Sequence, residues 1–274
     1  MQRLALGVLS LASAVFGADL QQEKARQLYD RADFHGSLQL LFQLPKRDAN
    51  ASELIGRNYY MLGEYKKAIT SLEEAITLEP NDSNHYLWLG RAQGRRAEHA
   101  NPLVAPSCAT KARVNFEKAV ELNPRNVEAL SDLFEYYLEA PGFLGGGFDK
   151  ATAIANRIAE LDRVEAHYAR YRLAEKKGDL ASAEKALRCA QPERIVDLAR
   201  FLAKHGRFQE SDALFQSAEM SRKPGVLFDR AETYIRHGRN LDQARDLLKR
   251  YLAAELSPDD PPRRDAEKLL KRSL

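Results

Sequence analysis

The glycine-rich segment at 141–150, PGFLGGGFDK, contains the residues with the clearest potential for chemistry. A phosphate-binding loop has the pattern G-x-x-x-x-G-K-[ST] after a strand, so that backbone amides and a lysine meet the phosphates together. Gly142 and Gly147 have this spacing, but Phe148 stands where the lysine belongs. We therefore interpret the segment as an enlarged turn between helices, with an apolar tip at Phe143, and expect no nucleotide cofactor.

The six histidines are the next candidates, for catalysis or for binding a metal. His205 and His237 each precede a glycine, in KHGRF and RHGRN, where a histidine interacts favourably with the carboxyl end of a helix. His85 and His99 have no partner at the spacing of a zinc motif such as H-E-x-x-H. Signatures of a nucleophile with its base are also missing from the sequence. We expect no catalytic residue, no metal site and no cofactor.

Charged residues are numerous and balanced. The 274 residues include 42 Lys and Arg against 39 Asp and Glu, a formal net charge of +3, and the two signs are mixed along the chain. A hydrophobic content of 44% supports a sizeable core, and 30% charged residues suit helices with one solvated face. This balance does not favour nucleic acid or an anionic membrane as a partner.

A pattern of two helices recurs along the chain, and residues 50–80 show it best. Gly63 marks a turn, small and apolar residues then recur at helical spacing, and Pro80 ends the segment. The order resembles the tetratricopeptide (TPR) repeat, a unit of about 34 residues in which small residues let two antiparallel helices approach closely. The matched positions are Ile55, Gly56, Tyr59, Ala68, Leu72, Ala75 and Pro80.

The resemblance covers residues 18–257 and implies an all-α fold: a right-handed α–α superhelix, or TPR solenoid, of about seven helical hairpins. One hairpin cannot bury its apolar face alone, so each needs neighbours. Residues 258–274 are predicted to form a helix that caps the open end. We expect enlarged turns near 95–111 in the third hairpin and at 140–147 in the fourth, and Pro192 in the first turn of a helix.

The amino-terminal residues 1–17 are predicted to be a signal peptide. Arg3 precedes an uncharged run at 4–18, in which Ala12 and Ala14 form an A-x-A cleavage pattern. The run is shorter than the roughly 20 residues that span a bilayer, although an uncleaved anchor is the alternative. We therefore expect a periplasmic or secreted protein with no membrane span after cleavage.

The two cysteines, Cys108 and Cys189, lie in different predicted hairpins. An exported protein would carry them into an oxidising compartment. A disulfide nevertheless needs their Cα atoms within about 7 Å of each other. Two free thiols are therefore expected.

The resemblance also implies where a partner binds, because the first helix of each TPR hairpin lines a concave groove. Residues one turn apart on such a helix share a face. Projection onto this geometry gives nine groove residues: Arg57, Arg91, Arg95, Tyr168, Arg172, Lys176, Arg200, Lys204 and Arg236. Glu135 and Glu139 interrupt the basic row, while Tyr60, Trp88 and Phe228 offer nearby aromatic anchors. The alternative is a solvated face with scattered cations.

The function that the resemblance implies is that of a non-enzymatic scaffold binding a protein or peptide, for which an acidic segment is one candidate. A factor for envelope protein assembly or secretion is an alternative of the same class. An RNA-binding helical repeat is less favoured by the balanced charge. An enzyme would require the two enlarged turns to converge. The sequence does not indicate an oligomeric state.

Overall fold

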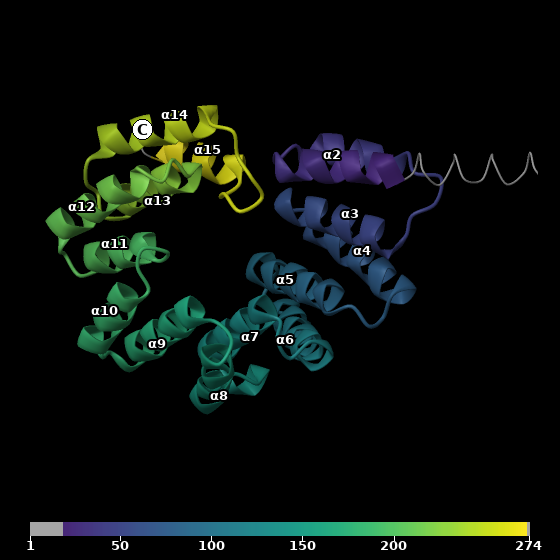
Figure 1. Ribbon diagram of the computed structural model, residues 1–274, viewed down its shortest axis with the longest axis horizontal. Helices are drawn as coiled ribbons and strands as arrows, with labels where there is room; N and C mark the ends of the chain where they lie inside the picture. The colour runs from purple at the N-terminus through teal and green to yellow at the C-terminus, as the bar shows by residue number, and fades with distance from the viewer. Residues whose placement is uncertain (1–18, 273–274) are drawn as a thin grey trace, which may run out of the picture. The chain divides into compact units, whose positions relative to one another are not determined.

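The computed structural model describes residues 19–272, and within that range every regular element is a helix (Figure 1). The predicted signal peptide at 1–17 lies outside the described residues. Residues 19–30 are helical. The elements that follow are α2 (Phe34–Phe42), α3 (Ala49–Met61), α4 (Tyr65–Leu78), α5 (Ser83–His99), α6 (Ala105–Leu122), α7 (Val127–Glu139), η1 (Gly142–Leu144), α8 (Phe148–Ala159), α9 (Arg163–Lys177), α10 (Leu180–Cys189), α11 (Ile195–Lys204), α12 (Phe208–Glu219), α13 (Pro224–Arg236), α14 (Leu241–Ala253) and α15 (Arg263–Arg272).

Capping side chains and turn glycines set where the helices begin and end. Side chains of Asp48, Asp82 and Asn126 accept backbone amide hydrogens at the starts of α3, α5 and α7, which satisfies donors that have no partner within the helix. Gly178 has φ +78° at the end of α9, a backbone conformation that glycine adopts without steric cost. Short connections of this kind return the chain beside the helix it has just left.

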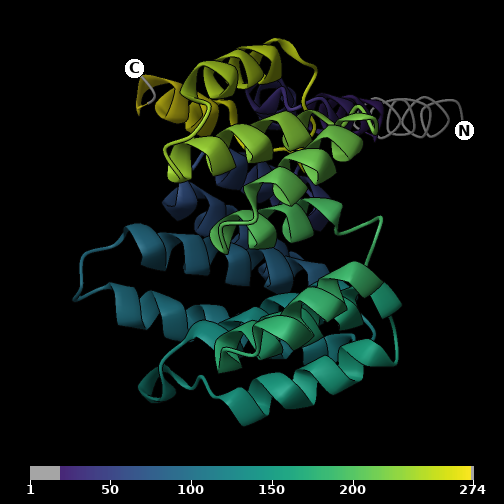
Figure 2. The same cartoon turned by 90° about the vertical axis from the view of Figure 1, so that its left-hand side faces the viewer.

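The chain divides into two compact units, residues 1–122 and 123–274. In the first unit α3 pairs with α4 and α5 with α6, while the helix at 19–30 shares a core with α2. In the second unit the pairs are α7 with α8, α9 with α10, α11 with α12 and α13 with α14. The green to yellow helices in Figure 2 show the later pairs lying side by side. The all-α class and the seven hairpins are thus confirmed for the described residues.

Small residues occupy the places where the two helices of a hairpin approach most closely. Ala68 and Ala112, at corresponding positions of successive hairpins, are 0% and 1% exposed. A Cβ on Gly56 would lie 2.6 Å from Leu72 Cγ. This register matches the one that the sequence pattern predicts, and it allows side chains from the opposite helix to fill the core.

The third hairpin corrects one expectation. The extra residues near 95–111 were expected to enlarge a turn, yet α5 has 17 residues and α6 has 18, against 13 in α3 and 14 in α4. Each helix has gained four residues, about one turn, and only 100–104 connect them. An insertion of matching length in both helices preserves their pairing, so the hairpin is longer rather than looped.

Two further expectations at turns were tested. Pro192 does not lie in the first turn of a helix, because α11 begins at Ile195 and Pro192 belongs to the turn that precedes it. The enlarged turn at 140–147 is confirmed and contains η1. Lys150 Nζ donates a hydrogen bond to the Gly145 carbonyl oxygen (2.9 Å), and Phe143 is 82% exposed at the tip. The lysine thus binds its own turn.

The carboxyl-terminal helix α15 packs against α13 and α14. Ala266 is fully buried there, and Arg263 donates hydrogen bonds to the carbonyl oxygens of Leu252 and Ala254, next to the end of α14. Asp260 accepts the Gly225 amide hydrogen at the start of α13 (2.9 Å). The helix therefore covers the last hairpin, as a terminal cap must, and residues 273–274 of the predicted range lie outside the described residues.

Two glycines of α5 test whether close packing fixes the hairpin register. A Cβ on Gly90 would lie 2.6 Å from Phe116 Cδ1, whereas one on Gly94 would meet only Ala112 Cβ, at 3.9 Å. Both changes to alanine gain the same helix propensity. We expect Gly90→Ala to lower the free energy of unfolding by roughly 1 to 3 kcal/mol relative to Gly94→Ala, because it overpacks the crossing. Urea denaturation measures this difference, and equal stability of the two variants would contradict the assigned packing.

Candidate groove site on the first helices of unit 2

The second unit contains a pocket with a volume of about 380 Å³ between the first helices of three successive hairpins, α9, α11 and α13. Aromatic and charged side chains line it together. They are Tyr168, Tyr171, Arg172, Glu175, Asp197, Arg200, Phe201, Lys204, Glu232, Thr233, Arg236 and His237. The first helices thus form one recessed surface, as the TPR resemblance implies.

Five of the nine predicted groove residues line this pocket: Tyr168, Arg172, Arg200, Lys204 and Arg236. Lys176 is on α9 but outside the lining, and its Nζ contacts Glu139 (2.9 Å). The other three, Arg57, Arg91 and Arg95, belong to the first unit. The structure therefore brings together the residues predicted in unit 2, and their role in binding stays a prediction.

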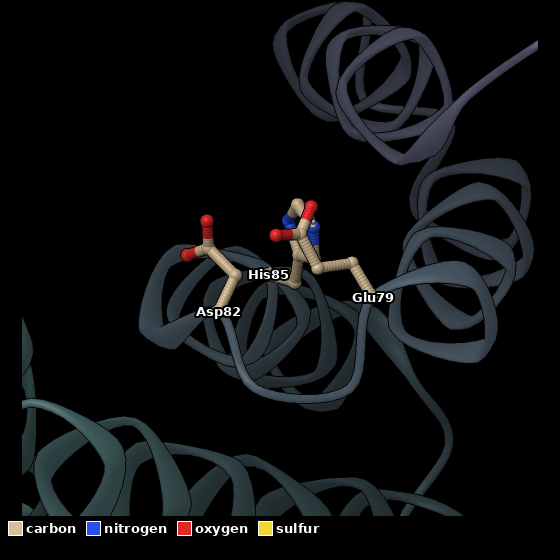
Figure 3. A group of neighbouring side chains, drawn as sticks. All are labelled: Glu79, Asp82 and His85. Atoms are coloured by element: carbon tan, nitrogen blue, oxygen red, sulfur yellow. Dashed lines mark ion pairs between the residues drawn. The ribbon is translucent and has the colours of Figure 1, made fainter.

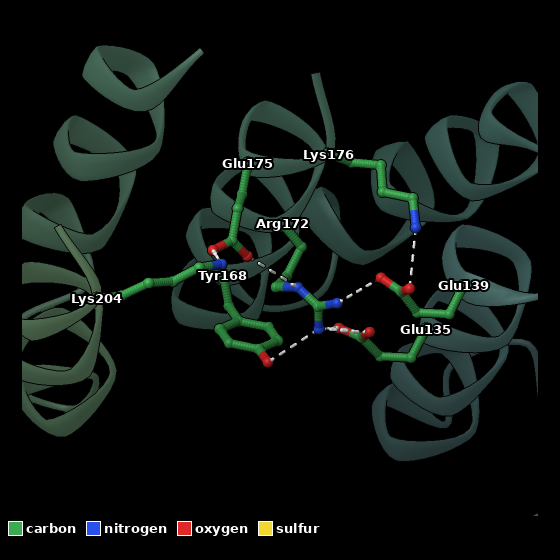
Figure 4. A network of polar contacts seen from close by, with 7 residues as sticks. All are labelled: Glu135, Glu139, Tyr168, Arg172, Glu175, Lys176 and Lys204. Carbon is green, nitrogen blue, oxygen red and sulfur yellow. Dashed lines mark hydrogen bonds and ion pairs between the residues drawn. The ribbon is translucent and has the colours of Figure 1, made fainter. Parts of the chain in front are cut away.

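Arg172 is at the centre of a polar network that joins three hairpins (Figure 4). Its Nη1 lies 2.5 Å from both carboxylate oxygens of Glu135, and its Nη2 lies 2.8 Å from Glu139 Oε1. On the other side, Lys204 of α11 donates to Glu175 of α9 (2.8 Å). The acids that interrupt the basic row in the sequence are therefore the partners of its central arginine.

A second set of ion pairs links α11 to α13. Arg200 Nη2 lies 2.6 Å from Asp229 Oδ1 and 3.0 Å from Glu232 Oε2. Glu232 also contacts Arg236 on its own helix (3.1 Å). Every pair of adjacent first helices from α7 to α13 is thus bridged by opposite charges, which sequence projection alone did not identify.

These acids could have been recognised from their distance along the chain. The Lys204–Glu175 and Arg200–Glu232 pairs are separated by 29 and 32 residues, and Arg172–Glu135 by 37. These separations are close to one repeat length. An acid one repeat away from a groove cation is therefore a usable signal for an ion pair between neighbouring hairpins.

The pKa values of these partly buried acids shift in different directions. Burial raises the pKa of Glu135, although the Arg172 guanidinium opposes the shift. For Glu175, burial acts in the same direction, but the hydrogen bond from Lys204 prevails and lowers the pKa. Asp229 is the most affected, because burial raises its pKa to about 6 in spite of Arg200. Burial and the neighbouring cations thus act on these acids in opposite directions.

The aromatic residues have distinct surroundings. Arg194 Cζ lies 4.3 Å from the centre of the Tyr168 ring, so a cation already covers one face of that ring. Tyr171 packs edge-to-face on Phe201, with ring centres 5.9 Å apart. Phe228, expected near the groove as an anchor, is 7% exposed and packs against Tyr251 in the core. It does not line the pocket between α9, α11 and α13.

The predicted residues of unit 1 gather around Trp88. Arg57 and Arg91 place their guanidinium carbons 4.5 Å and 4.8 Å from the indole ring, and Tyr60 packs edge-to-face against it at 5.5 Å. Arg95 pairs with Glu98 (2.5 Å) and also interacts with Tyr65, which packs against Tyr60. Arg57 and Arg91 thus both make cation–π contacts with Trp88.

Histidines and cysteines contribute little to this site. His205 and His237 cap the carboxyl ends of α11 and α13, as predicted, and His237 also borders the pocket. Cys108 is buried, Cys189 is exposed, and neither is in a disulfide. Within residues 19–272, no helix is both long and apolar enough to cross a membrane.

Comparison with known proteins identifies the repeat. Residues 56–95 match the family model described as TPR repeat. A search of curated proteins gives no match. Among solved structures, the thermophilic TPR protein TTC0263 of Thermus thermophilus is similar, with a TM-score of 0.56 and 20% identity over 71% of this chain and 98% of that one.

Two other solved structures have similar folds. A tetratricopeptide repeat protein from Parabacteroides merdae ATCC 43184 has a TM-score of 0.57 and 15% identity, covering 93% of this chain and 98% of its own. The human IFIT1 dimer with PPP-AAAA has a TM-score of 0.59 and 18% identity, covering 86% of this chain and 55% of its own. At such identities the likeness shows the fold alone.

The stacked hairpins define the chain as an α-helical repeat protein. More narrowly, residues 56–95 match the tetratricopeptide repeat, and the chain shares its fold with the TPR structures described above. This fold implies an interaction scaffold.

The raised pKa of Asp229 predicts how stability depends on pH. An unfolded aspartate titrates near 3.9, so between that pH and about 6 the folded chain binds more protons at Asp229 than the unfolded chain does. The contribution of Asp229 to the unfolding free energy therefore falls as pH rises through this window. Asp229→Asn should remove this contribution. The change in unfolding free energy between pH 4.5 and pH 6.5 should then differ from that of the parent by roughly 1 to 3 kcal/mol. Urea denaturation of both proteins at the two pH values measures the effect, and identical differences would refute it.

Proposed function

We propose that the chain is a non-enzymatic TPR scaffold that binds an extended segment of a protein or peptide in the pocket between α9, α11 and α13. The observation that carries this proposal is the pocket itself, which three successive first helices line with both aromatic and charged side chains. An extended segment lying across three helices contacts each in turn. Such a surface binds without any catalytic group.

The chemistry of the pocket favours a segment with an acidic and an apolar side chain close together. Tyr171 and Phe201 supply apolar area, and Lys204 and Arg236 are 62% and 68% exposed in their side chains. The lining contains four Arg or Lys side chains against three Asp or Glu. An acidic group therefore meets a small excess of positive charge at the exposed cations.

The ion pairs of the pocket differ in how readily they can exchange partners. Lys204 and Arg236 are mainly exposed, and such pairs contribute little to stability, so a ligand carboxylate can replace their present partners. Arg172 is only 20% exposed and contacts Glu135, Glu139 and Tyr168. Its reversal to glutamate would unpair buried charge and change the fold as well as the surface. Lys204 and Arg236 are thus the better test of binding.

Neutralising these two cations should weaken binding without loss of the fold. We expect Lys204→Gln with Arg236→Gln to reduce the affinity for acidic peptides selected from a random library by about tenfold, which corresponds to 1.4 kcal/mol. The matched control is Lys185→Gln with Lys249→Gln, which removes the same charge from the exposed surfaces of the second helices α10 and α14. Fluorescence anisotropy measures the affinities, and thermal melting confirms that all proteins are folded.

The outcomes separate the candidate functions. Equal loss in the two double variants would show that only net charge matters, and unchanged affinity in both would leave the groove a solvated face. IFIT1 was solved with PPP-AAAA, so the same titration with a triphosphate-bearing oligoadenylate tests the RNA alternative. Saturable binding of that oligonucleotide that is lost in the variant with Lys204→Gln and Arg236→Gln would show an RNA ligand in place of a peptide.

The place of action that we propose is the periplasm or the cell exterior, where such a scaffold could assist in assembling envelope proteins. The support is the apolar run at 4–18 with its A-x-A pattern. The mass of the exported protein should correspond to an amino terminus between Val15 and Asp19. Intact Met1 in a membrane fraction would instead favour an uncleaved anchor.

A further inference from the structure

The connection between α4 and α5 gathers three side chains with metal-binding atoms. Glu79 follows the end of α4, Asp82 caps the start of α5, and His85 lies in the first turn of α5. One ligand atom from each lies within 4.8 Å of the others (Figure 3). Their spacing of three residues across a turn differs from the helical zinc motif that the sequence lacks.

His85 is the distinctive member of this cluster. Its side chain is fully buried, and its Nδ1 lies 2.6 Å from Glu53 Oε2 on α3. Its Nε2 is also buried and has no hydrogen-bond partner among the described residues, with Glu79 Oε2 the nearby carboxylate at 4.0 Å. A buried polar atom without a partner is costly, so its position beside two carboxylates requires an explanation.

We propose that Glu79, Asp82 and His85 bind a divalent transition-metal ion of the zinc class, with Glu53 orienting His85. In known metal sites a ligating histidine commonly donates its other ring N–H to a carboxylate, which fixes the tautomer and the ring orientation. The Glu53–His85 contact has this form. It leaves Nε2 as the lone-pair donor that faces Glu79 and Asp82.

The ligand set selects the class of ion. An imidazole nitrogen with two carboxylate oxygens suits zinc and neighbouring transition metals, whereas magnesium and calcium prefer oxygen ligands throughout. Three protein ligands leave the fourth tetrahedral position to water. The three surrounding carboxylates also offset the charge of a divalent ion at the amino-terminal end of α5.

Binding requires the three ligand atoms, which now lie within 4.8 Å of one another, to move closer together. Ligands about 2.0 to 2.2 Å from one zinc ion lie about 3.5 Å apart in a tetrahedron, against 4.0 Å between His85 Nε2 and Glu79 Oε2. Glu79 is 56% exposed and can move inward. Asp82 Oδ1 accepts the Asn84 amide hydrogen (2.6 Å), which leaves its second oxygen for the ion. The helix cap and the metal ligand can thus coexist.

Metal binding here would join two successive hairpins of unit 1. Glu79 belongs to the second hairpin, Asp82 and His85 to the third, and Glu53 to the first helix of the second. An ion at this point would fix the α4–α5 connection and stabilise the folded chain by mass action.

The test is zinc titration of the full chain, followed by calorimetry, in a Cys189→Ser background that removes the exposed thiol. We expect one bound ion, a higher melting temperature with zinc, and at least tenfold weaker binding in Glu79→Gln. Glu73→Gln on the exposed side of α4 is the matched control and should bind as the parent does. The Glu79→Gln variant should fold because Glu79 is exposed, whereas a change at the buried His85 could unfold the chain.

A nitrogen-15 spectrum of His85 distinguishes a ligand from a structural imidazolium. The proposal requires the Nε2 resonance to move on zinc addition while Nδ1 keeps its proton. Equal zinc affinity in the Glu79 and Glu73 variants would overturn it, as would a protonated Nε2 at saturating zinc, which would make His85 a cation bridging Glu53 and Glu79. Magnesium or calcium binding as tightly as zinc would overturn the proposed class of ion.

Discussion

The structure depends on the close approach of two helices within each hairpin. Buried alanines such as Ala68 and Ala112 permit this approach, and glycines such as Gly56 and Gly90 leave room for Leu72 and Phe116. Because one hairpin cannot cover its own apolar face, each contact between neighbours contributes to the stability of both. Extra residues are tolerated where they leave the crossing of the two helices unchanged. In the third hairpin both helices are one turn longer, so their crossing is preserved.

Charge pairing provides a second level of organisation in unit 2. The first helices α7, α9, α11 and α13 are connected by ion pairs centred on Arg172 and Arg200. Partly buried charges of this kind add specificity more than net stability, since their desolvation offsets their attraction. They join side chains on the facing sides of neighbouring first helices. The same pairs leave Lys204 and Arg236 exposed at the surface, so one network both positions the groove and presents its exchangeable cations.

The two candidate sites differ in shape and in the chemical groups that define them. The groove of unit 2 is recessed, carries mixed charge and is lined by side chains from three hairpins, which suits an extended ligand. The cluster around His85 is compact and local, and its defining feature is a buried nitrogen without a hydrogen-bond partner among residues 19–272. Because that atom is buried, the ligand we propose for it is a small cation. The two candidate sites thus lie in separate units, and each can be tested without the other.

Sequence by itself determined the hairpins, because they arise from local periodicity, small residues at Gly56 and Ala68, and turn glycines such as Gly178. It also placed Arg172, Arg200 and their neighbours on the first helices, since positions one turn apart share a face. Only the tertiary structure decided which acids neutralise those cations, because such partners lie about a repeat apart and meet only when hairpins stack. Likewise, Glu53 and His85 are 32 residues apart, and no motif spacing links them. Contacts within a helix can be predicted from order along the chain, whereas contacts between hairpins depend on the packing that brings them together.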